Sequence, residues 1–153
     1  MKVGDLVIVA SLGEIKAYKA APRTLEAEAG LKPNEVKLDL VKAIDIVEAH
    51  KKLSDLLTGV EEGVKKAGFL NRAASGEKHN LKEEIYKEAV KVLAEDLDSI
   101  IDELGGRVFL ALPATISNDV TKKLKNKDKI TKLVKKDLIK TDKNRLIEEF
   151  KIG

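Results

Sequence analysis

The sequence predicts a single-domain α/β protein whose mixed sheet has about five strands and is flanked by helices. Three observations support this prediction. The 153 residues are the length of one domain. Short apolar runs of strand length alternate with longer stretches of helical spacing. Three strand-like segments precede the first long helix-like one, so one sheet is expected to combine an antiparallel hairpin with later crossovers.

The first part of the chain holds the three expected strands. Residues 6–10 are a continuous apolar run that is too short for a buried helix. A turn containing Gly13 joins them to residues 15–20, where apolar and polar side chains alternate, so we expect a hairpin. One helical turn is expected at residues 24–29. Alternation resumes at residues 36–40 and predicts a half-buried third strand.

Helical spacing first appears at residues 46–57. Residues 59–80 then carry four glycines among charged residues and predict a long loop, which in a compact domain is usually functional or disordered. The next helix is expected to begin at Asn80, because its side chain can cap a helix while Glu83 reaches back to it. It is expected to end at the glycine pair 105–106, since glycine tolerates the left-handed cap.

The last third of the chain predicts two strands and two helices. Residues 107–112 form an apolar strand that Pro113 ends, and residues 114–125 follow with helical spacing. Residues 130–134 are compatible with a helix or an edge strand, and we favour the edge strand because lysines flank a β-branched cluster. Residues 142–150 predict a short terminal helix.

Composition excludes several classes of protein. Without cysteine, the chain has no disulfide, thiolate zinc site, iron–sulfur cluster or cysteine nucleophile. No apolar stretch approaches the roughly 18 residues of a membrane helix, and the first residues lack a signal peptide's apolar core, so we expect a soluble cytoplasmic protein. No nucleotide-binding glycine motif is present, and no cofactor is expected. Abundant Lys and Glu, together with the absence of Gln, predict a thermophilic source.

The net charge of +3 hides a strong asymmetry. Residues 1–121 carry 17 basic and 21 acidic side chains, whereas residues 122–153 carry 12 and 5, so the two parts have net charges of −4 and +7. We call residues 122–136 the basic segment. Its basic residues are Lys122, Lys123, Lys125, Lys127, Lys129, Lys132, Lys135 and Lys136.

Two interpretations of the basic segment stay open. It could bind the phosphate backbone of RNA, because clustered cations raise the local potential. Alternatively, its lysines form a solvated face that neutralises the acidic helix before it. With only four arginines in the chain and few aromatic residues, base reading by stacking is disfavoured, so any RNA binding should be led by phosphate contacts.

Several short motifs resemble those of one family. They are the hairpin at residues 5–11, Ser75-Gly76-Glu77-Lys78-His79, Ala111-Leu112-Pro113 and the Lys-Asp-Leu at residues 136–138. In this order they resemble the host-attachment protein family, the bacterial and archaeal relatives of the middle domain of the eukaryotic peptide-chain release factor. The resemblance covers nearly the whole chain and implies a ribonuclease-H-like sheet whose second strand is antiparallel.

The resemblance also implies partners and a site. It suggests association with the ribosome, ribosomal RNA or transfer RNA, and it places residues 67–80 where the release factor has its catalytic Gly-Gly-Gln. The chain contains no Gln, so hydrolysis of peptidyl-tRNA by that mechanism is not expected. The family's Gly-x-Gly-Arg-His pattern falls on Gly76, Lys78 and His79, with Ser75 and Glu77 at the other positions, so that Glu77 replaces a glycine and Lys78 replaces the arginine.

His79 is the candidate catalytic residue of the sequence. In a loop at a helix start it could act as a general base or hold an anion, with Arg72, Gly76 and Lys78 contributing to an anion site. The alternatives are a surface histidine, a hydrolase that uses His79 and a protein-interaction module without an RNA role. No metal site is expected, and the acidic residues at 95–103 are expected on the solvent-exposed face of a helix. The sequence does not decide whether the chain forms homo-oligomers.

Overall fold

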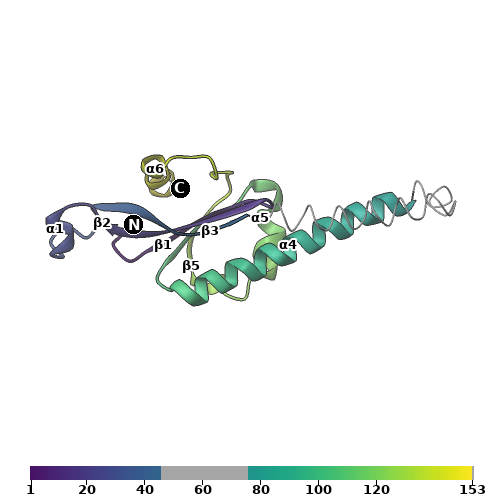
Figure 1. The fold of residues 1–153 in the computed structure, drawn as a ribbon, viewed down its shortest axis with the longest axis horizontal. Coiled ribbons are helices and arrows are strands. Elements are labelled where there is room, and N and C mark those ends of the chain that lie inside the picture. The colour runs from purple at the N-terminus through teal and green to yellow at the C-terminus, as the bar shows by residue number, and fades with distance from the viewer. Residues whose placement is uncertain (46–75, 153) are drawn as a thin grey trace.

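The computed structural model of the protein describes residues 1–45 and 76–152 (Figure 1). The predicted α/β class is confirmed, with helices on both faces of a five-stranded sheet. The elements in chain order are β1 (Leu6–Ala10), β2 (Glu14–Pro22), α1 (Leu25–Glu28), β3 (Val36–Asp45), α4 (Gly76–Leu104), β4 (Val108–Ala111), α5 (Ala114–Lys123), the 3-10 helix η1 (Lys127–Lys129), β5 (Ile130–Val134) and α6 (Lys143–Ile152).

The sheet is mixed, and its strands are ordered β3-β2-β1-β4-β5. β2 pairs antiparallel with both β1 and β3, whereas β4 pairs parallel with both β1 and β5. Only β2 therefore runs against the other strands, as predicted. β5 lies at one edge of the sheet, which decides between the two structures that the sequence left open for residues 130–134.

Helices cover both faces of the sheet, which explains why β1 is apolar throughout. Leu6 and Ile8 face a core shared with α4 and α5. Val7 and Val9 face a second core, which α6 closes. Figure 1 shows α6 on one side of the sheet and α4 on the other. Because successive side chains of a strand point to opposite faces, a strand buried on both sides has no polar positions.

A β-bulge makes β3 longer than the sequence predicts. Ala17 pairs with Lys42 and Tyr18 pairs with Leu40, so Val41 is an extra residue in β3. The extra residue reverses which side chains face which helix, because the side-chain period of a strand is two. Before the bulge β3 packs toward α6, and after it Ile44 packs toward α4. The alternation stops at the bulge, so the sequence pattern ended the strand too early.

Helix α4 already includes Gly76, so two predictions are wrong: residues 76–80 are not loop, and Asn80 does not begin the helix. Nothing in the Glu-Lys-His sequence before Asn80 breaks a helix, and Asn at an interior position costs only a fraction of a kcal/mol. The helix ends as predicted, with Gly105 at a φ of 62° and its amide donating to the Ile101 carbonyl at 2.9 Å. The predicted helix at 46–57 and the rest of the predicted loop lie outside the described residues.

The remaining elements agree with prediction to within a few residues. The helical turn at 24–29 is α1, capped by the Thr24 hydroxyl, which accepts a hydrogen bond from the Ala27 amide at 3.0 Å. β4 is shorter than predicted, and α5 ends at Lys123. α6 covers the predicted terminal helix. Among the described helices, none has the length and apolar character needed to cross a membrane.

Candidate functional site

The described residues of the predicted His79 site lie in a helix rather than in a loop. Arg72 lies outside the described residues, and Gly76, Lys78 and His79 lie in the first turn of α4. The prediction of a histidine in a glycine-bearing loop is therefore corrected to a histidine in a helix. Within residues 1–45 and 76–152, no group of three or more His, Cys, Asp or Glu side chains could hold a metal ion.

The basic segment extends from the last turn of α5 through η1 and β5 to the turn that follows. Its exposed lysines are Lys122, Lys123, Lys125, Lys127, Lys129, Lys135 and Lys136, while Lys132 is half-buried. The segment runs beside α4, because Tyr86 bonds Asp119 at 2.7 Å and Lys129 approaches Asp102 at 3.8 Å. The lysines of α5 and η1 thus lie beside α4, whereas Lys132 and Lys136 of the same segment contact α6 on the other face of the sheet.

Asp98 holds the basic segment where the chain leaves α5, a contact that the sequence did not predict. Its carboxylate accepts the amides of Lys125 and Asn126 at 3.0 and 2.9 Å and is only 8% exposed. The prediction that the acidic residues of this helix are all solvent-exposed is therefore wrong. Burial, and next the neighbouring Glu95, raise the pKa of Asp96 above its usual range. Asp98 faces inward because the chain leaving α5 has unpaired amides there that need an acceptor.

Three lysines of the basic segment are bound within the molecule. Lys129 pairs with Asp102 at 3.8 Å, Lys136 pairs with Glu149 at 3.0 Å, and the Lys132 ammonium donates to the Phe150 carbonyl. In the described chain no ion pair or side-chain hydrogen bond involves the ammonium groups of Lys122, Lys123, Lys125, Lys127 and Lys135. Of the three lysines named, Lys129 pairs with the acidic helix α4, as the alternative interpretation expects, whereas Lys132 and Lys136 contact α6.

Two further lysines, missed from the sequence, join this surface. Lys87 and Lys91 of α4 line a groove of ≈ 470 Å³ together with Lys123. The floor of the groove is apolar, with Leu81 and Ile85 half-buried. Two glutamates, Glu84 and Glu88, also line it. The spacing of Lys87 and Lys91 is the signal that could have found them, because residues four apart lie on the same side of a helix.

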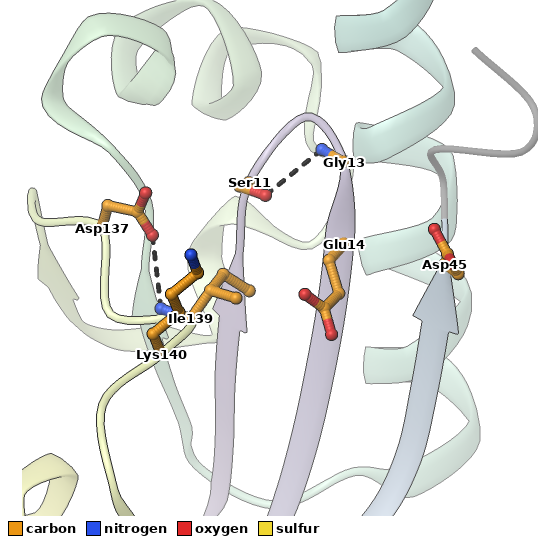
Figure 2. A pocket seen from close by; sticks show the side chains of 7 residues that line it. All are labelled: Ser11, Gly13, Glu14, Asp45, Asp137, Ile139 and Lys140. Atoms are coloured by element: carbon orange, nitrogen blue, oxygen red, sulfur yellow. Dashed lines mark hydrogen bonds between the residues drawn. The ribbon is translucent and has the colours of Figure 1, made fainter. Parts of the chain in front are cut away.

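A second hollow lies beyond the carboxyl end of β1 (Figure 2). It has a volume of ≈ 510 Å³. The hairpin turn between β1 and β2, the end of β3 and the segment after β5 contribute its walls. The lining residues are Ser11, Gly13, Glu14, Asp45, Asp137, Ile139 and Lys140. In sheets with parallel strands, the region beyond the carboxyl ends is where ligands usually bind.

Most hydrogen bonds around this hollow are local. The Ser11 hydroxyl accepts the Gly13 amide at 3.2 Å, and the Asp137 carboxylate accepts the Ile139 amide at 3.3 Å (Figure 2). Next to these walls, Lys16 donates a long-range hydrogen bond to the Ile139 carbonyl at 3.2 Å and lies 3.8 Å from Glu14. Tight turns thus shape the walls of the hollow at Ser11 and Asp137.

The amino end of β1 is closed instead. Asp5, the acidic residue of the first motif, is buried and receives two hydrogen bonds from Arg107, at 2.9 and 2.7 Å. The Lys2 amide donates a third, at 2.6 Å. These bonds with Asp5 raise the pKa of Arg107.

The carboxyl ends of the paired parallel strands β1 and β4 bear no carboxylate, since both strands end in alanine. A nuclease with a ribonuclease-H-like sheet would hold two metal ions through carboxylates there, so this class of enzyme is disfavoured.

Comparisons with known proteins add no identification. No protein-family model matches the chain, and no significant match is found among curated proteins or among solved structures.

Proposed function

We propose that the chain is a cytoplasmic, release-factor-like factor that binds ribosomal or transfer RNA through the basic segment and lacks the Gly-Gly-Gln hydrolytic motif. The observation on which the proposal depends is the set of exposed lysines without intramolecular partners in the described chain, four of which, Lys122, Lys123, Lys125 and Lys127, follow one another from α5 to η1. Fixed cations of this kind displace counterions from a phosphate backbone, which gives affinity without base specificity.

Three further features support the proposal. The strand order, with β2 alone antiparallel, is compatible with the ribonuclease-H-like topology that the family resemblance implies. Lys87 and Lys91 extend the lysine surface onto α4. Asp98 holds the backbone at Lys125 and Asn126, so this part of the backbone is already ordered and loses less entropy on binding.

The proposal is tested by measuring binding to purified ribosomes and to transfer RNA over a range of salt concentrations. The variant with Lys122, Lys123, Lys125 and Lys127 all changed to Glu should bind much more weakly and show a shallower salt dependence. Co-sedimentation and fluorescence polarisation measure the two partners separately.

A matched pair of double variants controls for net charge. Lys125→Glu with Lys127→Glu changes the protein by the same total charge as Lys2→Glu with Lys37→Glu, and all four lysines are exposed. The first pair should weaken binding at least about tenfold more than the second, because only the first removes direct phosphate contacts. Equal effects of the two pairs, or no binding of the parent protein at low salt, would contradict the proposal.

A further inference from the structure

Two of the chain's four arginines line one hollow on the side of the sheet that α6 covers. Arg23 follows β2, and Arg145 lies in the first turn of α6. We call the space between them the arginine hollow; its volume is ≈ 540 Å³. The other residues that line it are Asn34, Val36, Asp142, Asn144, Ile147, Glu148 and Lys151.

Both arginines start from ordered backbone. The Arg23 amide donates to the Glu35 carbonyl at 3.0 Å, and this bond ties the end of β2 to the start of β3. The Arg145 amide donates to the Asp142 carboxylate at 3.0 Å, which caps α6. Two guanidinium groups from distant parts of the sequence are therefore brought to one hollow by structure that is already satisfied.

The carboxylates of the hollow are engaged, whereas its guanidinium groups are not. Asp142 accepts the Arg145 amide, and Glu148 lies 3.6 Å from the Lys151 ammonium. In the described parts of the chain no hydrogen bond or ion pair involves either guanidinium, and Arg23 acts on Glu35 only through a weak attraction that helps lower its pKa. Arg107 shows the contrast, because Asp5 takes up its donors.

We propose that the arginine hollow binds a phosphate group of RNA. A guanidinium offers paired donors that match two oxygens of a phosphate. Two such groups, with the side-chain amides of Asn34 and Asn144, provide enough donors for the tetrahedral oxygens. The inference rests on the proposed function and deepens it: the lysines of the basic segment attract the backbone, and the arginine hollow fixes one phosphate by geometry.

The test compares two neighbouring side chains of α6. Arg145→Ala and Lys143→Ala remove the same charge from the same helical turn, yet only Arg145 lines the hollow. Arg145→Ala should weaken RNA binding about tenfold relative to Lys143→Ala, since a charge-assisted hydrogen bond is lost. Arg145→Lys should also weaken binding but leave the salt dependence unchanged, because the charge stays and the paired donors are lost. Both positions are exposed, and thermal melting checks that each variant folds.

Inorganic phosphate alone provides a second measurement on the full chain. Its titration should shift the side-chain NMR signals of Arg23 and Arg145 together. RNA oligomers with and without a 5′-phosphate then distinguish a terminal phosphate from a backbone phosphate.

The outcomes separate the two proposals. If RNA binds and Arg145→Ala is no weaker than Lys143→Ala, the arginine hollow is overturned and the proposed function stands. If phosphate shifts both arginine signals while no RNA binds, the phosphate site stands, and both the RNA ligand and the proposed function are overturned. If phosphate shifts neither arginine signal and no RNA binds, the phosphate site of the arginine hollow is overturned as well.

Discussion

The two ends of the central strand β1 differ in how their polar groups are used. At the amino end, Asp5 is buried against Arg107, and the Lys19 ammonium donates to the carbonyls of Gly4 and Gly105, both at 3.1 Å. At the carboxyl end, Glu14 and Asp137 border an open hollow, and the hydrogen bonds are mostly local (Figure 2). The polar groups at the amino end are thus paired in a closed network, whereas those at the carboxyl end border an open hollow.

The largest expected effect is that of Gly106→Ala at the amino end. Gly106 has a φ of 85°, and a Cβ there would lie 2.6 Å from the Gly4 carbonyl oxygen and 3.2 Å from the Lys19 ammonium. Backbone strain and steric overlap together should lower the free energy of unfolding by about 3 kcal/mol. Gly105→Ala is the matched control: its φ is 62° with nothing within 4 Å, so it should cost about 1 kcal/mol. Denaturant melts compare the two, and equal losses would contradict the close approach.

Removing the partner of Asp5 should have the next largest effect. Arg107→Met leaves a buried carboxylate with only the Lys2 amide as a donor among the bonds described. Because the Arg107 side chain is itself 47% exposed, we expect a loss of about 2 kcal/mol, below that for a fully buried pair. The double variant Asp5→Asn with Arg107→Met should recover part of this loss in chemical denaturation. A single variant as stable as the parent would show that the closed end contributes little.

A smaller effect is expected at the corner between β2 and β3. Thr24 caps α1 and also donates to Glu35 at 2.7 Å, a bond that lowers the pKa of Glu35. Thr24→Ala should cost about 1 kcal/mol through the lost cap. It should also raise the pKa of Glu35 in an NMR titration. Because folding lowers the pKa of Glu35, its ionised carboxylate stabilises the fold at pH values above the pKa of the unfolded chain, and this contribution is lost as the pH falls through the pKa of the folded chain. The variant lacks the bond from Thr24, so its stability should fall less over that pH range. An unchanged Glu35 titration would contradict this role for Thr24.

The smallest effect is expected at the carboxyl end. Glu14→Gln and Asp137→Asn should each change the free energy of unfolding by no more than about 0.5 kcal/mol, since neither carboxylate is committed to a buried bond. Thermal melting at neutral pH measures both. A loss as large as that of Arg107→Met would remove the contrast between the two ends of β1.

The sequence was most informative where local pattern and tertiary environment agree. The apolar run of β1, the alternation of β2 and the glycines that end α4 were all predictable, because burial on two faces, burial on one face and a left-handed cap each have a local signature. It failed at Val41 and at Gly76. A bulge is compensated by the neighbouring strand, and a helix start lacking a decisive cap depends on packing.

The candidate sites also have a part that the sequence predicts and a part that it does not. The lysines of the basic segment were found from composition, because charge asymmetry is a property of the chain itself. The tertiary structure alone decided that Asp98 binds the backbone at Lys125, that Lys87 and Lys123 line one groove, and that Arg23 and Arg145 line one hollow. Sequence thus determined the elements and the sign of the charge. The partners of each polar group were decided by folding, because they come from residues far apart in the chain.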